Sequence, residues 1–155
     1  MTGKVVYVED GDTLVMLVGQ TQMEVRLSSI DAPETAHTKK STGRIGQPFS
    51  RNSKEHMARI KGLTVEANCF EKDRYKRDVC EIFVDGKSVN QDMVRSGWAW
   101  ANTSNNRRYL RDKSLPALEE AARSQRAGLW ADSSPVPPWE WRERCWKAGD
   151  CQLSR

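Results

Sequence analysis

Apolar and β-branched residues fill three short runs at the start of the chain, and turn residues separate them. The runs cover residues 3–9, 13–18 and 22–29, and the turns between them are Asp-Gly-Asp and Gly-Gln. This pattern predicts three consecutive strands. We expect them to form an antiparallel meander, and a sheet of this kind can curl into a small barrel.

Two further strands are predicted over residues 63–70 and 79–84, with the polar segment 71–78 as the hairpin between them. Helices are predicted where apolar residues take a helical spacing after a proline or a capping serine, with a glycine near the end. They span residues 48–61, 88–96 and 114–127. Residues 35–47 are rich in Thr, Lys, Ser and Gly and lack apolar periodicity, which favours a mobile surface loop.

The end of the chain has a different composition. Leu129 and Trp130 are expected to fold back on the core, and from Asp132 onwards the prolines favour an extended segment along the surface. We therefore expect one domain over residues 1–131, followed by a Pro- and Trp-rich tail over residues 132–155 that packs on its surface. The tryptophans expected to pin this tail are Trp139, Trp141 and Trp146.

Charge and hydropathy narrow the classes of partner. The chain has 25 Lys and Arg against 21 Asp and Glu, a net charge of +4, which favours polyanionic partners without proving one. Its longest apolar runs fall well short of the roughly 18 residues that a membrane-spanning helix needs. We expect a soluble protein with no membrane segment.

The four cysteines fall into two pairs. Cys69 and Cys80 lie symmetrically about the predicted hairpin turn, and Cys145 and Cys151 bracket a short stretch of the tail. Both pairs could be disulfides, which indicate an oxidising compartment; the alternative is free thiols in a cytosolic protein. With disulfides we expect a periplasmic or secreted protein. Because the N-terminus has no signal peptide, its numbering would then begin after signal removal.

Three acidic residues stand in positions suited to metal and water chemistry. Asp12 and Asp31 follow strands in turn contexts, so a fold that joins those strand ends would place two hard oxygen donors together, as Ca²⁺ or Mg²⁺ requires. The alternative is ordinary turn formation. Glu34, one residue past Pro33, could hold a water as general base, or could be merely an exposed glutamate.

Two arginines could bind phosphate. Arg26 and Arg77 could each grip phosphate oxygens and neutralise charge that grows in a pentacoordinate transition state. The alternative for either one is an ion pair with a nearby acid. The only two histidines, His37 and His56, have no partner in the sequence that suggests a catalytic role.

Four motifs follow one another over most of the chain, from about Val5 to Trp130. They are Asp10-Gly11-Asp12-Thr13, Arg26-Leu27-x-x-Ile30-Asp31-Ala32-Pro33-Glu34, Asp73-Arg74-Tyr75-x-Arg77, and Asp85-Gly86-x-x-Val89-Asn90 with Val94-Arg95-x-Gly97-x-Ala99. In this order and spacing they resemble the staphylococcal nuclease (thermonuclease) family. The resemblance implies an α+β, mainly β fold, an OB-fold five-stranded antiparallel barrel with three helices. It also implies a Ca²⁺-dependent enzyme.

The resemblance also implies roles for single residues. The positions of Asp12 and Asp31 bind Ca²⁺ through carboxylates and that of Ala32 through its backbone carbonyl, while Glu34 orients or deprotonates the attacking water. Arg26 and Arg77 match the two phosphate-binding arginines of the family. The residues expected to contact substrate beside them are Arg74, Tyr75 and Lys76.

The chain departs from the family pattern in three places. Ala32 replaces a threonine, Lys76 stands where the family usually has glycine, and Asn102-Thr103-Ser104 takes the place of tyrosines expected after the Gly-x-Ala segment. We predict a monomeric, sugar-nonspecific, Ca²⁺-dependent nuclease of DNA and RNA that favours single-stranded or locally open substrates. The alternative is a non-catalytic OB-fold nucleic-acid-binding module, which would have no reason to keep Asp12, Asp31 and Glu34 together.

Overall fold

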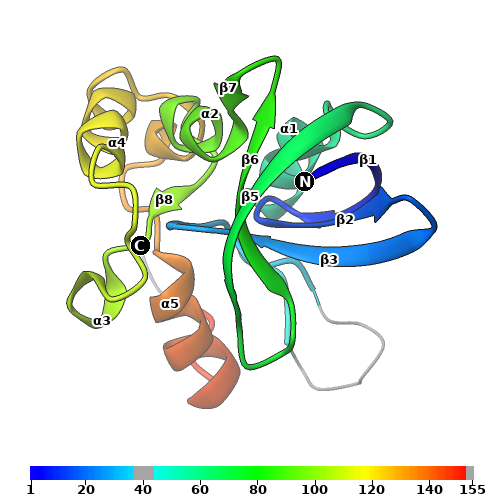
Figure 1. The fold of residues 1–155 in the computed structure, drawn as a ribbon. Coiled ribbons are helices and arrows are strands. Elements are labelled where there is room, and N and C mark those ends of the chain that lie inside the picture. Colours follow the sequence, from blue (N-terminus) through cyan, green and yellow to red (C-terminus); the bar gives the residue numbers. More distant parts are fainter. Residues whose placement is uncertain (37–43, 153–155) are drawn as a thin grey trace.

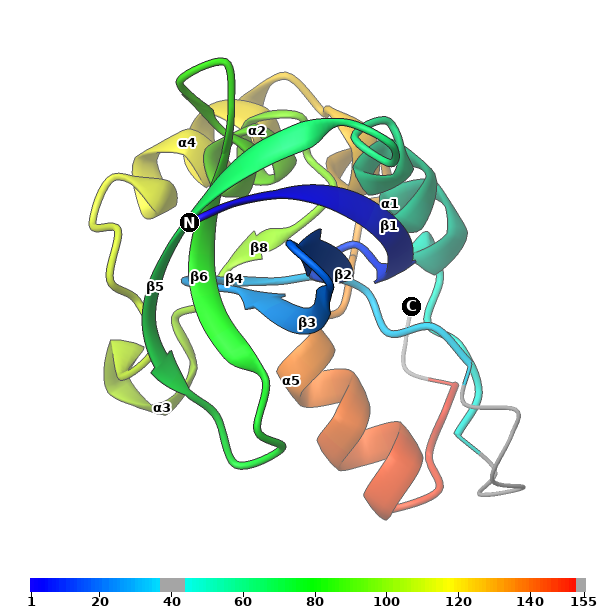
Figure 2. The same ribbon diagram turned by 45° about the vertical axis from the view of Figure 1, so that its right-hand side comes forward.

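A closed barrel of five strands forms the body of the protein in the computed structural model, which describes residues 1–36 and 44–152 (Figures 1 and 2). The strands lie in the order β3-β2-β1-β5-β6, and β6 closes the barrel by pairing with β3. They are β1 (Thr2–Asp10), β2 (Thr13–Val18), β3 (Thr21–Leu27), β5 (Thr64–Lys72) and β6 (Asp78–Val84). The α+β OB-type fold expected from the sequence is confirmed.

One strand pairing of the barrel corrects the prediction of a wholly antiparallel sheet. β3 and β6 run parallel, with Val25 opposite Asp78 and Leu27 opposite Cys80. The other barrel pairings are antiparallel. A parallel pair needs a long crossover connection rather than a hairpin, and here the chain between β3 and β6 passes through a helix and β5. Strand orientation in the barrel is therefore mixed.

Helices form at the three places that the sequence indicates. They are α1 (Ser50–Ala58), α2 (Val89–Arg95) and α4 (Leu115–Ser124), each shorter than the predicted range. Ser88 caps α2 as expected, since its hydroxyl accepts a hydrogen bond from the Gln91 amide at 3.2 Å. Ser114 does not cap α4: its hydroxyl donates to Asp112 instead.

Short elements complete the chain. They are β4 (Ile30–Asp31), β7 (Lys87–Ser88), β8 (Trp100–Ala101), α3 (Ser104–Arg107), a 3₁₀ turn at Gly128–Ala131, α5 (Pro138–Trp141) and a π-helix at Arg142–Lys147. β4 pairs with β8, which fixes the segment after β3 against the second half of the chain. Leu129 and Trp130 are buried beside Trp100, as predicted.

The tail corrects a second prediction. From Pro138 to Lys147 it is helical rather than extended, and the helix projects away from the barrel (Figure 2). Pro138 at the first helical position lacks only a backbone donor that would have no partner there, so it starts the helix. Trp141 and Cys145 are buried in a small cluster of their own.

Buried residues alternate with more exposed ones along much of the barrel strands. The fully buried side chains inside the barrel are those of Val5, Leu14, Met16, Val25 and Ile82. Met93 of α2, which is also fully buried, belongs to the same core cluster. Burial of this apolar surface is the main stabilising contribution, at about 25 cal/mol for each Å² removed from water. The barrel therefore gives the loops at its end a rigid base.

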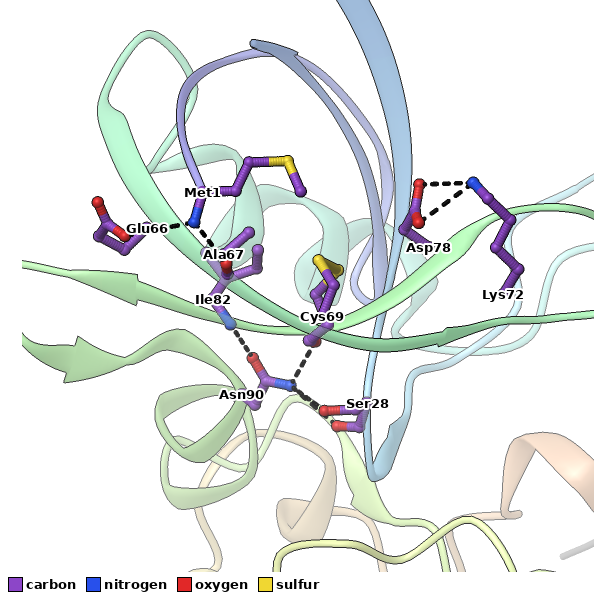
Figure 3. The surroundings of a disulfide bond; sticks show 10 residues. Met1, Ser28, Glu66, Ala67, Cys69, Lys72, Asp78, Ile82 and Asn90 are labelled. Atoms are coloured by element: carbon purple, nitrogen blue, oxygen red, sulfur yellow. Dashed lines mark hydrogen bonds and ion pairs between the residues drawn. A yellow bond between two sulfur atoms is a disulfide. The ribbon is translucent and has the colours of Figure 1, made fainter.

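Asn90 of α2 ties the barrel to the turn that leaves β3 (Figure 3). Its side-chain amide donates to the carbonyl oxygens of Ser28, at 2.9 Å, and Cys80, at 3.2 Å, and its oxygen accepts from the Ile82 amide at 3.0 Å. Asn90, Ser28, Cys80 and Ile82 are all buried, so these backbone groups depend on protein partners for their hydrogen bonds. The Ser28–Ser29 turn is thereby held against β6.

Both predicted cysteine pairs are disulfides. Cys69 and Cys80 lie directly opposite each other on β5 and β6, as the hairpin predicted, and the second bridge joins Cys145 to Cys151. The predicted surface loop over residues 35–47 lies partly, and His37 wholly, outside the described residues. No helix within residues 1–36 and 44–152 is long and apolar enough to cross a membrane.

Candidate active site

Two carboxylates meet where the β1–β2 turn touches the end of β3. The Leu27 amide donates to the Asp12 carbonyl oxygen at 2.8 Å, which joins the two strand ends. The Asp12 carboxylate then accepts a hydrogen bond from the Ala32 amide at 2.7 Å. The side chains of Asp12 and Asp31 are 7% and 0% exposed. The fold thus joins the two strand ends, which is the condition under which the sequence places two oxygen donors side by side.

Arg26 lies between these two acids. Its Nη2 is 3.4 Å from Oδ2 of Asp12 and 3.3 Å from Oδ1 of Asp31. Its Nη1 donates to the carbonyl oxygens of Leu27 and Ile30, at 2.9 and 3.0 Å. The guanidinium thus both pairs with the acids and holds the turn from β3 into β4, in which Ser29 takes a left-handed φ of 68°.

Glu34 is held by its backbone as well as its side chain. Its amide donates to Oε1 of Gln47 at 3.2 Å, and the Gln47 amide donates back to the Glu34 carbonyl oxygen at 2.8 Å. The Glu34 side chain is 15% exposed, so the prediction of a merely exposed glutamate does not describe it. Gln47 was not singled out in the sequence, because a lone glutamine in a polar stretch carries no distinguishing pattern.

Arg142 enters the same place from the C-terminal helix and was missed by the sequence analysis. Its Nη2 lies 2.7 Å and its Nη1 3.2 Å from the two carboxylate oxygens of Asp31. Its Nη1 also donates to Oε1 of Glu34. One planar guanidinium therefore bridges both acids. The available signal was weak: an arginine directly after the paired tryptophans of the tail.

The ionisation of these acids reflects burial and mutual repulsion. Burial, followed by repulsion from Asp31, raises the pKa of Glu34 to about 7, although Arg142 opposes the shift. Burial and the neighbouring Asp12 raise the pKa of Asp10 well above its usual value. Burial opposes ionisation of Asp12 too, but Arg26 and several hydrogen bonds outweigh it and lower the pKa of Asp12.

Acidic groups outnumber basic groups here. Asp10, Asp12, Asp31 and Glu34 interact with one another, while the cations paired with them are Arg26 and Arg142. Burial also raises the pKa of Asp31 despite both arginines. Such an excess of buried carboxylate favours an additional cation.

The donor set suits a hard cation that retains water ligands. Within the described parts of the chain, no three His, Cys, Asp or Glu side chains form a metal-binding group by themselves. Two carboxylates, from Asp12 and Asp31, and the carbonyl of Ala32 would make a partial shell of oxygen ligands. Ca²⁺ and Mg²⁺ accept such a shell because waters and a substrate phosphate can complete it. The residues therefore fit Ca²⁺ as a partly hydrated ion.

The remaining predicted site residues lie on the β5–β6 turn. Arg77 donates from Nε to Asp73 at 2.8 Å, so within residues 1–36 and 44–152 it forms an ion pair with Asp73 and not with the acids of the site. Asp73 also accepts from the amides of Tyr75 and Arg77, at 2.9 and 3.0 Å, which shapes the turn. The structure therefore does not join Arg77 directly to Arg26.

Aromatic and basic side chains are exposed on this turn. Tyr75 is 64% exposed, and the guanidinium carbons of Arg74 and Arg77 lie 5.0 and 5.2 Å from its ring centre. Lys76 has a left-handed φ of 67°, the conformation that glycine adopts without cost. This explains why glycine is usual at that position, and it shows that the turn forms with lysine too.

Comparison with known proteins identifies relatives over most of the chain. The model of a family described as staphylococcal nuclease homologue matches residues 24–132. The chain is 42% identical over 144 residues to an uncharacterized endonuclease of Escherichia coli O157:H7, covering 92% of this chain and 85% of that protein. It is 33% identical over 153 residues to a micrococcal nuclease of Shigella flexneri, covering 90% and 79%.

Proposed function

The chain belongs to the staphylococcal nuclease family and is a nuclease, and on that premise we propose that it hydrolyses phosphodiester bonds of both DNA and RNA with Ca²⁺. The observation that supports this most is the shared position of two buried aspartates, a partly buried glutamate and Arg26 at one end of the barrel. An isolated binding module needs positive charge for phosphate and gains nothing from this group of acids.

The proposed metal chemistry rests on the carboxylates of Asp12 and Asp31 and the carbonyl of Ala32, which would hold Ca²⁺. When bound, the ion supplies positive charge for a phosphate oxygen and favours ionisation of water nearby. The matches of these residues to the family pattern support the assignment, as does the excess of acid over base around them.

Glu34 is proposed as the general base that takes a proton from the attacking water. A base works best when its pKa is near the working pH, and burial beside Asp31 raises the pKa of Glu34 to about 7. Arg26 would neutralise charge that develops on the phosphate. Arg77 is proposed to bind phosphate from the β5–β6 turn.

The exposed turn supports a proposal about substrate form. Tyr75, with Arg74, Lys76 and Arg77 around it, offers an aromatic face beside positive charge. Unpaired bases stack on such a face without a sequence requirement. We therefore expect single-stranded or locally open DNA and RNA to be favoured, with a monomeric enzyme as the active form. The two disulfides support a periplasmic or secreted location.

The test is hydrolysis of circular and single-stranded DNA, and of RNA, with Ca²⁺, Mg²⁺ or EDTA in parallel. We expect activity that EDTA abolishes and Ca²⁺ restores. Glu34→Gln should lose roughly 10²–10⁴-fold in turnover while substrate binding survives, since general base catalysis contributes about this factor. The matched control is Glu120→Gln at an exposed glutamate of α4, which should change neither.

Two results would contradict the proposal. Hydrolysis that is indifferent to chelation would remove the role of the metal, and unchanged turnover in Glu34→Gln would remove the role of the base. Nucleic-acid binding without hydrolysis under any of these conditions would instead favour the non-catalytic binding module.

A further inference from the structure

The C-terminal helix delivers a cation to two acids that lie far away in sequence. Arg142 is separated from Asp31 by 111 residues and from Glu34 by 108. It lies at the start of the π-helical stretch Arg142–Lys147, beyond the end of the family match at residue 132. π-Helical turns are rare and occur frequently at functional sites. The position of Arg142 therefore needs an explanation beyond helix packing.

The arginine is fixed in place by the residues around it. Trp141, immediately before it, is buried and donates from Nε1 to the Ile45 carbonyl oxygen at 3.2 Å. Trp146 donates to the same oxygen at 2.9 Å. Cys145, also buried, is bonded to Cys151 and closes the end of the helix. The helix is thus anchored on both sides of Arg142.

The same loop segment that anchors the helix also holds Glu34. Gln47, two residues past Ile45, binds the Glu34 backbone through its own amide and its side-chain oxygen. Its side-chain nitrogen donates to the carbonyl oxygen of Val136 in the tail. Glu34, Gln47, the tail and Arg142 therefore form a closed ring of contacts, which fixes the glutamate relative to the arginine.

We propose that Arg142 is a positioning residue of the nuclease site, which orients the Glu34 carboxylate relative to Asp31 and so makes the tail part of the catalytic unit. This inference rests on the proposed function of Glu34. A guanidinium suits the role because its planar fork engages both oxygens of Asp31 and still reaches Glu34. It also offsets the repulsion between two neighbouring carboxylates.

A different role for Arg142 would be that of an internal plug that competes with the metal. The anchoring by Trp141, Trp146 and the disulfide argues against a plug, because a plug must move away before the metal can bind. Oδ1 of Asp31 accepts from both Arg26 and Arg142, but Oδ2 accepts from Arg142 and keeps a second lone pair, so Asp31 can bind a cation while it is paired with Arg142. The two roles predict opposite effects of removing the side chain.

The test compares Arg142→Ala and Arg142→Lys with Arg144→Ala as matched control. Arg144 lies on the same helical stretch but is half exposed and pairs with Glu140 and Asp150. Loss of a residue that orients a site typically lowers activity by roughly 10–100-fold. We expect Arg142→Ala to show this loss in kcat with KM for single-stranded DNA unchanged, partial recovery in Arg142→Lys, and wild-type values in Arg144→Ala.

A second measurement does not depend on activity. Thermal unfolding in EDTA is measured for four proteins, which form a double-mutant cycle: wild type, Arg142→Ala, Glu34→Gln and the double variant. We expect the Tm shift of the double variant to differ from the sum of the two single shifts. Additive shifts would overturn the proposal even if the wild type proves to have no nuclease activity. Non-additive shifts with an inactive wild type would refute the proposed function and leave the Arg142–Glu34 interaction standing.

Two kinetic results would also overturn the positioning role. A rise in KM with kcat unchanged would show that Arg142 binds substrate instead. Higher kcat together with tighter Ca²⁺ binding by calorimetry in Arg142→Ala would show that it is a plug.

Discussion

Replacing Glu34 with glutamine should change how stability depends on pH in the metal-free protein. The pKa of this carboxyl is raised by burial and Asp31 from 4.5 to about 7 in the folded state. Below pH 4.5 the group is protonated in both folded and unfolded chains and contributes nothing. As pH rises towards 7, the unfolded chain loses the proton while the folded chain keeps it, so ionisation favours unfolding and stability falls.

The size of the effect follows from the shift. About 2.5 pKa units at 1.36 kcal/mol each is ~3 kcal/mol, and the low exposure of the side chain, 15%, means that solvent screening reduces it little. Glu34→Gln cannot ionise, so its free energy of unfolding should improve relative to wild type by ~3 kcal/mol between about pH 4.5 and pH 7. The pKa of about 7 already includes the opposing effect of the ion pair with Arg142, so that interaction is not subtracted again.

The assay is urea unfolding in EDTA over that pH window for wild type, Glu34→Gln and the exposed control Glu120→Gln. Asp10 and Asp31 also have raised pKa values, and both interact with Glu34, so the difference between variant and wild type includes the change in their pKa values when the Glu34 charge is removed. A difference that stays constant across the window, or one that moves in favour of wild type as pH rises, would refute the reasoning about burial.

Two further predictions concern the supports of the site. Asn90→Ala should lower the free energy of unfolding, measured in urea, by ~3 kcal/mol, because the buried Ile82 amide and the Ser28 and Cys80 carbonyls lose this partner. It should also lower nuclease activity by loosening the turn into β4. Asn68→Ala, at an exposed position of β5, is the control, and equal effects of the two would contradict this role. The double replacement Cys69→Ser and Cys80→Ser should lower stability by ~3 kcal/mol, measured by thermal unfolding. A Tm unchanged by this replacement would show that the β5–β6 hairpin does not need the bridge.

The local sequence pattern was enough to predict most helices and strands, but not how the strands close into a barrel. Alternating apolar residues and turn sequences predicted the five strands, and Ser88 predicted the start of α2, because strand and cap preferences act over a few residues. The parallel pairing of β3 with β6 was not predictable in this way. It depends on how the whole barrel closes, which no short window of sequence contains.

The tail shows the same limit. Its prolines predicted an extended chain, yet Pro138 begins a helix because proline suits the first helical position, and burial of Trp141 and Cys145 stabilises the turns that follow. The cysteine pairs were predictable for a simpler reason: Cys69 and Cys80 are placed opposite each other by the register of one hairpin.

The sequence by itself determined the family, the barrel class and the acids on which the proposed chemistry rests, because Asp12, Asp31 and Glu34 stand in motifs whose order and spacing are visible along the chain. Only the tertiary structure decided what surrounds them. Arg142 reaches Glu34 across 108 residues, and Gln47 holds the glutamate's backbone, through contacts that exist only once the tail packs against the barrel. Residue type and local spacing encode short-range preferences, whereas a long-range ion pair depends on the folded path of everything between its partners.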